Sequence, residues 1–391
     1  MQRTADAVIV GGGVHGASLA FHLASRGLRP LVLEATTVAS GATGRSSGLV
    51  RMHYDLEAEA RLAWASFPWF RNWRELVGGG DCGFVRTGFL QLEERDHEER
   101  LRSNVAMHQR LGIPSLLVTA DDVARLAPAF STADFAIAAY EPESGYADPS
   151  ATTAGFLAGA RERGASLVQG CRVTGVTSTG GRVSGVESSQ GPVAAPIVVD
   201  AAGVRAGSVA RLVGLELPIE TWRHDTAFVL RPGGPLTRHP TVIDDINAMY
   251  FRPEGGELTL VGLEDDAAIG GEPEDGPGAP AADFPERVVD RICRRIPGLA
   301  EGRLQSTQRG IDGLTPDQRP ILGPAAGGPN GFYLACGFSG TGFKIAPAVG
   351  AAMAELIVDG SSTTVDLAPF GMERFTEGRL LRGRLERPIW R

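Results

Sequence analysis

Cysteines are scarce in this chain and lie far apart. The 391 residues include only four of them, at Cys82, Cys171, Cys293 and Cys336, and no two form a C-x-x-C pair. This spacing suggests neither a zinc site nor a disulfide framework, because both need cysteines in recognisable groups. We therefore expect free thiols and no metal site.

Long apolar runs are also missing. No stretch of 18 apolar residues occurs, so the sequence predicts no membrane-spanning helix. Residues 1–3 lead directly into the first apolar segment and leave no room for a signal peptide. On these grounds we expect a cytoplasmic protein.

A strong charge of either sign is lacking as well. The net charge of −8 is mild and argues against non-specific binding to nucleic acid. With 43% hydrophobic and 21% charged residues, the composition is typical of a globular protein. Because 391 residues exceed a comfortable single core and show no internal repeat, two domains are expected.

The segment 6–34 does carry a clear pattern, which is that of a complete strand–helix–strand unit. Its uncharged, β-branched run at 7–10 has the composition of a strand buried on both faces. Gly11, Gly13 and Gly16 follow with G-x-G-x-x-G spacing. In that motif the first glycine makes a tight turn, the second lets the backbone approach a pyrophosphate, and the third lets the helix close on the strand.

The rest of this unit supports the binding of a dinucleotide. A helix at about 13–26 would point its N-terminal amides at the phosphates. After a second buried strand comes Glu34, 21 residues beyond Gly13, where such folds hold a ribose 2′-hydroxyl. An acid at this place disfavours a 2′-phosphate, so NADP is not expected.

Three further segments could bring backbone close to a flat cofactor. The loop 40–51 is rich in small and hydroxyl residues. A predicted buried strand at 197–200 runs into small residues, and another at 331–336 meets the glycine-rich turn 337–344 before a helix at 345–358. Among the other predicted helices, 56–76 contains Pro68 as a possible interruption, one begins at Thr119, and one begins at Asp148 or Ser150.

The pattern changes at about residue 218. Alternating segments there predict an antiparallel sheet with one exposed face, followed by an irregular surface loop and a helix. The predicted strands are 226–231, 240–244, 249–252 and 257–262, the loop is 270–283 and the helix is 284–295.

Together these motifs resemble the D-amino-acid-oxidase superfamily of FAD enzymes. The stretches that carry the resemblance are GGGVHG with Glu34, SGATGRSSGLVR, VVDAAG, TPDQRPILGP and ACGFSGTGFKIAPAVGAAMAELI. Within the superfamily they are most similar to the branch of sarcosine oxidase, dimethylglycine dehydrogenase and the proline dehydrogenase β-subunit. The motifs are spread from residue 6 to about 375, and GFSGTGFK is far more specific than the glycine fingerprint.

The resemblance implies an α/β fold of two domains. The first would be a discontinuous Rossmann-like FAD-binding domain made of residues 1–80, 146–216 and 320–391. The second would be an α+β substrate-binding domain made of residues 81–145 and 217–319, with an antiparallel sheet that roofs the flavin.

It also implies a substrate site. In this family an arginine after the second strand and the lysine of GFSGxGFK hold the substrate carboxylate, and these positions look like Arg51 and Lys344 here. Tyr250 falls where the family has an active-site tyrosine, and Glu264 where monomeric sarcosine oxidase has a histidine. His53 and His224 could serve as bases, but a hydrogen-bonded structural role is favoured for each.

A larger set of residues is expected to contact the cofactor. It consists of Gly11, Gly13, Val14, His15, Gly16, Glu34, Ala35, Thr43, Gly44, Arg45, Ser46, Ser47, Gly48, Val173, Ala202, Gly203, Gly310, Gly337, Gly340, Thr341, Gly342, Phe343 and Lys344.

Two departures from the family pattern have consequences. Gly310 and Ser46 stand near the places of the family's covalent flavin anchors, a cysteine and a histidine, so the FAD is expected to be non-covalent. Residues 259–260 occupy the region of the oxygen-activating lysine of sarcosine oxidase. The electron acceptor, O2 or another, is therefore left open.

Three functions compete at this point. The favoured one is oxidation of the C–N bond of a carboxylated secondary or tertiary amine, by hydride transfer to flavin N5, to an imine that hydrolyses. The second is oxidation of a 2-hydroxy acid, which needs a base such as a histidine over the flavin, and none lies at 250–264. The third is an electron-relay subunit of a hetero-oligomer, which the presence of Arg51 and Lys344 disfavours. A homo-oligomer is equally compatible with the sequence.

Overall fold

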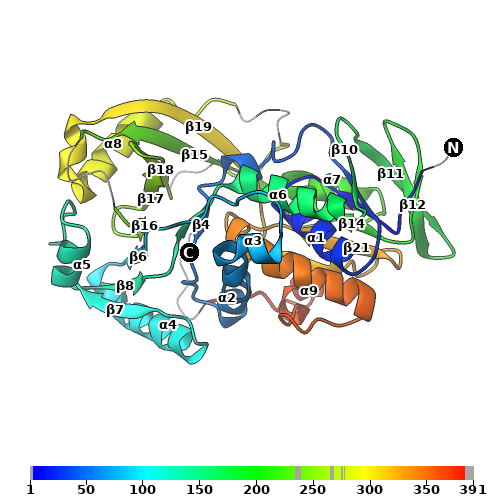
Figure 1. Ribbon diagram of the computed structural model, residues 1–391, viewed down its shortest axis with the longest axis horizontal. Coiled ribbons are helices and arrows are strands. Elements are labelled where there is room, and N and C mark those ends of the chain that lie inside the picture. Colours follow the sequence, from blue (N-terminus) through cyan, green and yellow to red (C-terminus); the bar gives the residue numbers. More distant parts are fainter. Residues whose placement is uncertain (1–2, 234–238, 265–267, 274–275, 277, 384–391) are drawn as a thin grey trace.

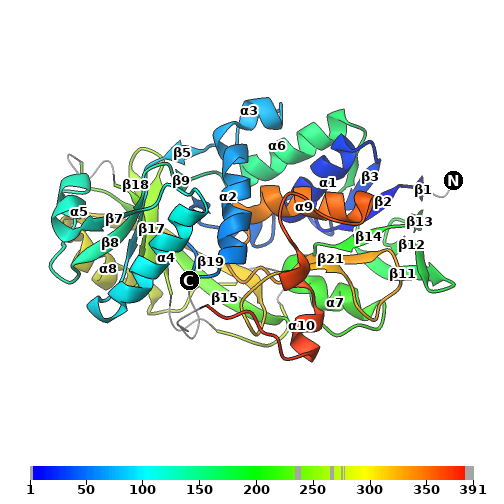
Figure 2. The same ribbon diagram turned by 90° about the horizontal axis from the view of Figure 1, so that it is seen from below.

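The computed structural model describes residues 3–233, 239–264, 268–273, 276 and 278–383. The molecule is elongated, with one large β-sheet towards each end and helices α2 and α9 between them and along one side (Figures 1 and 2). The α/β class and the second domain with its own sheet, both predicted from the sequence, are confirmed.

The first large sheet has six strands and contains the predicted strand–helix–strand unit. Four neighbouring pairs are parallel, and only the edge strand β20 runs antiparallel to β21. Its central strand β2 is buried along all four residues, as its β-branched composition predicts. In order across the sheet, the strands are β10 (Ser166–Val168), β3 (Pro30–Leu33), β2 (Ala7–Val10), β14 (Val198–Asp200), β21 (Phe332–Cys336) and β20 (Ile321–Pro324).

The second large sheet has eight strands. It is antiparallel except where β6 pairs with β16, so the predicted antiparallel sheet is a mixed one. The predicted exposed face is wrong for its middle strands, because helix α8 (Phe284–Arg295) packs beside β15, β18 and β19, and β16 is buried at all four residues. In order, the strands are β19 (Arg303–Leu314), β15 (Glu220–Leu230), β18 (Leu258–Leu263), β17 (Met249–Glu254), β16 (Thr241–Asp244), β6 (Phe89–Leu92), β8 (Ile137–Glu141) and β7 (Leu116–Thr119).

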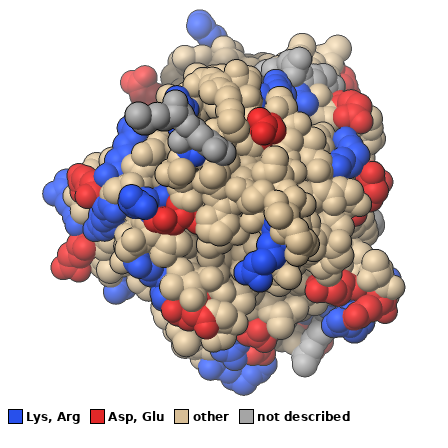
Figure 3. Space-filling view, turned by 90° about the vertical axis from the view of Figure 1, so that its right-hand side faces the viewer, with Lys and Arg blue, Asp and Glu red and all other residues tan. Residues whose placement is uncertain are grey.

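Two small sheets complete the strands. A four-stranded sheet comprises β1 (Arg3–Thr4), β13 (Val193–Ala194), β12 (Arg182–Ser188) and β11 (Val173–Thr179). A three-stranded sheet comprises β4 (Leu49–Val50), β9 (Gly145–Tyr146) and β5 (Val85–Arg86). Figure 3 shows the end of the molecule on the side of the four-stranded sheet. Acidic and basic side chains are mixed around a largely uncharged centre on this face.

The six-stranded sheet draws its strands from the three segments predicted for the FAD-binding domain, and the eight-stranded sheet from the other two. The exact boundaries between the domains stay a prediction.

Helix α1 packs against both α6 and α9 beside the six-stranded sheet, and the three helices contribute to the largest apolar cluster of the described residues. The predicted helix 56–76 is divided into two helices, α2 and α3. The division is at Asn72 and not at the predicted Pro68, which lies inside α2. The predicted caps are confirmed: Thr119 forms a capping box with Asp122, and Asp148 accepts hydrogen bonds from the first amides of α6.

None of the described helices is long and apolar enough to cross a membrane. The helices are α1 (Val14–Ser25), α2 (Glu57–Arg71), α3 (Trp73–Leu76), α4 (Glu98–Arg110), α5 (Ala120–Leu126), α6 (Pro149–Glu162), α7 (Ala206–Arg211), α8, α9 (Ala346–Asp359) and α10 (Glu373–Thr376).

Candidate functional site

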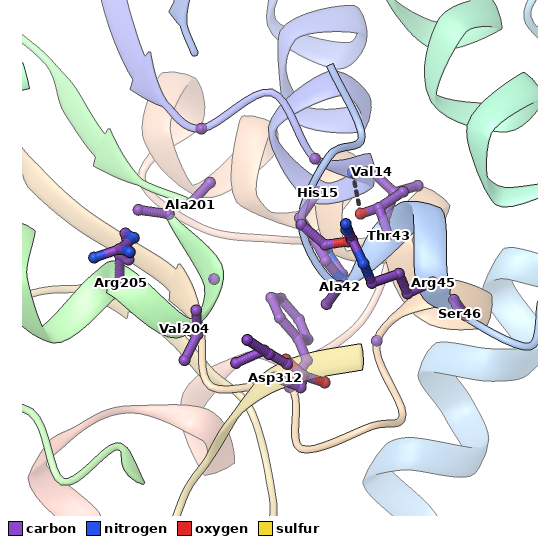
Figure 4. Close-up of a pocket in the computed structure, with 18 of the residues that line it drawn as sticks. Val14, His15, Ala42, Thr43, Arg45, Ser46, Ala201, Val204, Arg205 and Asp312 are labelled. Carbon is purple, nitrogen blue, oxygen red and sulfur yellow. Dashed lines mark hydrogen bonds between the residues drawn. The ribbon is translucent and has the colours of Figure 1, made fainter. Parts of the chain in front are cut away.

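One large cavity, of about 830 Å³, runs from the carboxyl ends of the parallel strands to the eight-stranded sheet. This is where open α/β sheets place their ligands. Its lining comes from segments far apart in the sequence. Figure 4 shows residues at the start of α1, in the loop after β3, in the turn after β14 and on β19. Residues on β15 and β17 also line the cavity.

One end of the cavity, which we call the dinucleotide end, is formed by Gly11, Gly13, Glu34 and Thr43. Gly11 has a φ of +111°, and a Cβ there would collide with the carbonyl oxygen of Ala201. A Cβ on Gly13 would stand 3.1 Å from the Thr43 hydroxyl oxygen. Both glycines line the cavity at the start of α1, and their missing Cβ atoms let Ala201 and Thr43 lie close to this turn.

Thr43 and Glu34 tie the neighbouring loops to this turn. The amide of Val14 donates to the Thr43 Oγ1 at 3.1 Å, as Figure 4 shows. The Glu34 Oε2 accepts from the Gly12 amide at 2.7 Å, and its Oε1 accepts from the Thr36 amide at 2.8 Å. The acid is thus held in place by backbone amides while it lines the cavity, next to the glycine turn.

Most of the other residues predicted to contact the cofactor also line this cavity. They are Val14, His15, Ala35, Arg45, Ser46, Ser47, Val173, Ala202, Gly203, Gly340, Thr341, Gly342, Phe343 and Lys344.

Five predicted glycines do not line the cavity. In each of them the missing Cβ makes room for a neighbouring group of the protein rather than for a ligand. The group is the Gly11 carbonyl at Gly16, the Ala39 carbonyl at Gly44, the Ala147 carbonyl at Gly48, the His224 ring at Gly310 and the Thr315 side chain at Gly337.

The opposite end of the cavity, which we call the charged end, is formed by Arg51, Lys344, Tyr250 and Glu264. The two cations are almost fully buried, at 2% and 7% exposure. They meet at the ring of Tyr54, which lies 4.7 Å from the Arg51 Cζ and 5.3 Å from the Lys344 Nζ. The arginine also donates to the His53 carbonyl oxygen.

The charge on Lys344 is costly in this setting. Burial, and then the neighbouring Arg51 cation, lower the pKa of Lys344 well below its ordinary value, while Glu59 acts in the opposite direction. Glu59 is itself fully buried and pairs with Arg319 at 2.6 Å, and burial raises its pKa to about 7. Arg51 and Lys344 thus bring two buried positive charges together at this end of the cavity, and a carboxylate bound there would offset both.

Tyr250 lies on β17 and Glu264 directly follows β18, so both line the cavity from the side of the eight-stranded sheet. The ring of Tyr250 packs over Gly262, its register partner on β18, where a Cβ would overlap it. Burial raises the pKa of Tyr250, and the Glu264 carboxylate adds to this effect. The tyrosine hydroxyl is therefore kept protonated and can donate a hydrogen bond into the cavity.

His224 was expected to have a structural role, yet it lines the cavity beside Trp222 and Asp312. Its ring packs over Gly310, its register partner on β19, and lies 4.5 Å from the ring of Trp222. Burial lowers the pKa of His224, whereas Asp312 acts to raise it. His224 is one of the two histidines named from the sequence as possible bases, and the alternation of β15, which puts it on the same face as Trp222, is the signal that favours the cavity over a structural role.

His53, in contrast, is not among the residues that line the cavity. It is buried behind Arg51, with its ring 4.7 Å from the ring of His108.

The shape and chemistry of the cavity fit the predicted cofactor. Its volume lies within the range of cofactor sites, and its dinucleotide end combines bare glycine backbone, a helix N-terminus and an acid. The residues that would hold FAD are those of the glycine turn, Glu34 and the loop around Thr43.

Comparisons with known proteins agree with this reading of the cavity. The profile of the DAO family, described as FAD dependent oxidoreductase, matches residues 6–356. The chain is 28% identical to sarcosine oxidase subunit beta of an Arthrobacter species, over 97% of this chain and 93% of that protein. It is also 28% identical to human mitochondrial sarcosine dehydrogenase, over 96% of this chain, but it spans only 42% of that relative's length. Among solved structures, L-proline dehydrogenase from P. horikoshii superimposes with a TM-score of 0.90 at 28% identity, covering 97% of this chain and all of that one.

Proposed function

Because the chain belongs to the DAO family of FAD dependent oxidoreductases, we propose that it oxidises the C–N bond of an amino acid whose nitrogen is secondary or tertiary. The substrate class is N-methylated or cyclic amino acids, similar to sarcosine or proline. The product is an imine, which water then hydrolyses. The relatives named sarcosine dehydrogenase, sarcosine oxidase subunit beta and L-proline dehydrogenase support this substrate class.

The observation that carries the proposal is the meeting of Arg51 and Lys344 at the charged end of the cavity. Bound FAD supplies the acceptor for the hydride that leaves the substrate. The work of the chain is to hold the substrate so that its C–H bond points in one direction, and two cations on one carboxylate do this with little freedom left.

The choice of residue at position 344 adds support. Lys344 is the only lysine in the chain, which uses arginine at every other cationic position. Lysine, unlike arginine, can lose its proton when it is buried. It can therefore be neutral before the substrate binds and become charged with the carboxylate, which spares the free enzyme part of the cost of two adjacent buried cations.

The remaining polar groups of the charged end would handle the substrate nitrogen. Oxidation requires the amine lone pair, so the nitrogen must be unprotonated. His224 lines the cavity, and one of its ring nitrogens would accept that proton. Glu264 and the hydroxyl of Tyr250, which also line the cavity, would hydrogen-bond the substrate nitrogen.

Several finer points belong to the proposal. The FAD would be non-covalent, since Gly310 faces His224 and Ser46 is a poor nucleophile. A small carboxylated amine is the expected substrate and O2 or another molecule the acceptor. The similarity to an oxidase subunit supports assembly with other chains. The cytoplasmic location stays a prediction.

The test is anaerobic bleaching of the bound flavin by a panel of compounds. N-methyl amino acids and cyclic amino acids should bleach it, whereas the matching decarboxylated amines should not. No bleaching by any N-alkyl or cyclic amino acid would overturn the proposal. Acid precipitation of the same preparation should release the yellow colour into the supernatant, and flavin in the pellet would contradict the non-covalent assignment.

The position of His224 favours one second candidate, a 2-hydroxy acid dehydrogenase. A histidine base over the flavin was the feature that this chemistry needs, and His224 lines the cavity. The same panel separates the two, because 2-hydroxy acids would then bleach the flavin and the amines would not.

A further inference from the structure

Three buried side chains with metal-binding atoms come together behind Arg51, outside the cavity described above. They are His53, which follows β4, His108 on α4 and Glu141 at the end of β8. Their exposures are 4%, 0% and 0%. One ligand atom from each lies within 4.8 Å of the other two. Because neighbouring members of this group lie at least 33 positions apart in the sequence, no local spacing predicts the group.

Each of the three has an atom that finds no hydrogen-bond partner among the described residues. These atoms are both ring nitrogens of His53, the Nδ1 of His108 and the Oε1 of Glu141. A buried polar atom without a partner costs about 1–3 kcal/mol. Unpartnered polar atoms on three side chains whose ligand atoms lie within 4.8 Å of one another indicate a missing partner, and a cation, which accepts lone pairs, is such a partner.

The other side of two of these ligands is already held by the protein. The Tyr54 carbonyl oxygen lies 2.8 Å from the His108 Nε2, closer than the Tyr54 amide at 3.2 Å, so Nε2 donates and Nδ1 keeps its lone pair. The Oε2 of Glu141 accepts from the Met52 amide at 2.9 Å and from the Ser144 hydroxyl at 2.6 Å. Ligands of metal sites are oriented by hydrogen bonds of this kind.

The electrostatic balance is mixed. Arg51 and Arg100 act on the His53 ring and oppose a second positive charge there. The Glu141 carboxylate, whose ligand oxygen lies within 4.8 Å of the ligand nitrogens of both histidines, favours it. Arg100 in turn is paired with Glu93 at 2.9 Å, which reduces its effect.

We propose that His53, His108 and Glu141 bind a divalent transition-metal ion, with zinc as the best-matched ion. Two imidazole nitrogens and one carboxylate oxygen are a common ligand set for zinc, with bonds of about 2.0–2.2 Å. In a tetrahedral site the ligand atoms would lie roughly 3.3 Å apart, so atoms that are now up to 4.8 Å apart would have to move closer together when the ion binds. The ion would join the segment behind Arg51 to α4 and β8, and so fix the arginine that faces the cavity.

The test measures zinc in the FAD-loaded full-length protein, with any affinity tag removed. After incubation with zinc and gel filtration, elemental analysis should find about one zinc per chain. Zinc-edge X-ray absorption, which the flavin colour does not obscure, should report nitrogen and oxygen neighbours at about 2.0 Å. Zinc should also raise the melting temperature of the protein.

Two variants and one control make the test specific. Glu141→Gln keeps the shape and the bonds to Met52 and Ser144, and His108→Gln removes one imidazole. Each should weaken zinc binding at least roughly tenfold and abolish the thermal shift, whereas His97→Gln, at a partly exposed histidine of the surface, should change neither. Should His108→Gln fail to fold, Glu141→Gln alone decides. No tight zinc binding to the wild type, or binding unchanged in Glu141→Gln, would overturn the proposal.

Discussion

The two ends of the cavity are built in different ways. At the dinucleotide end the contacts come from backbone and from residues close in the sequence, all within 11–43. At the charged end they come from buried side chains, and Arg51 and Lys344 are 293 residues apart. The shape of the dinucleotide end depends on glycines, which permit its tight turn. The properties of the charged end depend on charged side chains that only the folded chain brings together. Substitutions should therefore separate cofactor retention from substrate turnover.

The largest expected effect is at the charged end. Arg51→Ala and Lys344→Met each leave the other cation alone with the substrate carboxylate. Truncating one partner of a desolvated charge pair costs about 2–5 kcal/mol, so kcat/KM for a carboxylated amine should fall by roughly 30-fold to several-thousand-fold. FAD affinity should stay the same in both variants. Steady-state kinetics and flavin titration measure the two quantities.

The control for this prediction is Arg61→Ala, an exposed arginine of α2 that pairs with Glu57. It should leave kcat/KM unchanged. A decarboxylated analogue, already a poor substrate, should be little affected by either active-site variant. If it lost as much as the acid, the two cations would not act on a carboxylate, and an electron-relay role would become the better account.

The next effect is at the dinucleotide end. Gly11→Ala places a methyl group against the Ala201 carbonyl in a left-handed backbone conformation. The purified protein should therefore lose most of its FAD. Gly27→Ala is a matched control, because Gly27 also has a positive φ, of +87°, but a Cβ there meets nothing within 4 Å. Equal flavin content in the two variants, measured by absorbance, would contradict the role of close approach at Gly11.

A smaller effect concerns stability and pH. The folded protein holds the pKa of Lys344 well below its ordinary value of 10.5. At a pH between the pKa of Lys344 in the folded protein and 10.5, the unfolded chain therefore binds one more proton than the folded protein. The unfolding free energy of the wild type should therefore rise with pH in this window, and Lys344→Met lacks this contribution. The variant should thus be stabilised at pH 7, by a margin that shrinks towards pH 10. Denaturant unfolding at several pH values measures the margin, and one that grew with pH would contradict it.

The smallest effect is expected at Glu34. Glu34→Ala removes its hydrogen bonds to Gly12 and Thr36 together with the predicted contact to ribose. A loss of about 1–3 kcal/mol in FAD binding is expected, with the fold intact by circular dichroism. Unchanged FAD occupancy at limiting flavin would count against the ribose contact.

The contrast between the two ends also explains what could be predicted from the sequence. The unit 6–34 was readable because its strands, glycines, helix and acid obey local rules. The caps at Thr119 and Asp148 were readable for the same reason. Arg51 and Lys344 could be paired only through the resemblance to a family, because no local pattern joins them.

Other features depended on contacts that the sequence does not show. The role of Gly310 is set by the ring of His224 on the neighbouring strand. The cluster of His53, His108 and Glu141 comes from three separate elements. Long-range pairing decided each of these, and spacing alone could not predict it.

The central claim, that Arg51 and Lys344 jointly bind a carboxylate, has a direct test because the chain has a single lysine. Protein labelled with ¹³C at lysine Cε should give one side-chain signal by NMR, and its pH titration reports the pKa of Lys344. Saturation with acetate should raise this pKa, with uptake of a proton, whereas the neutral isostere acetamide should not. A Lys344 pKa that is the same with acetate, with acetamide and with no ligand would contradict the account.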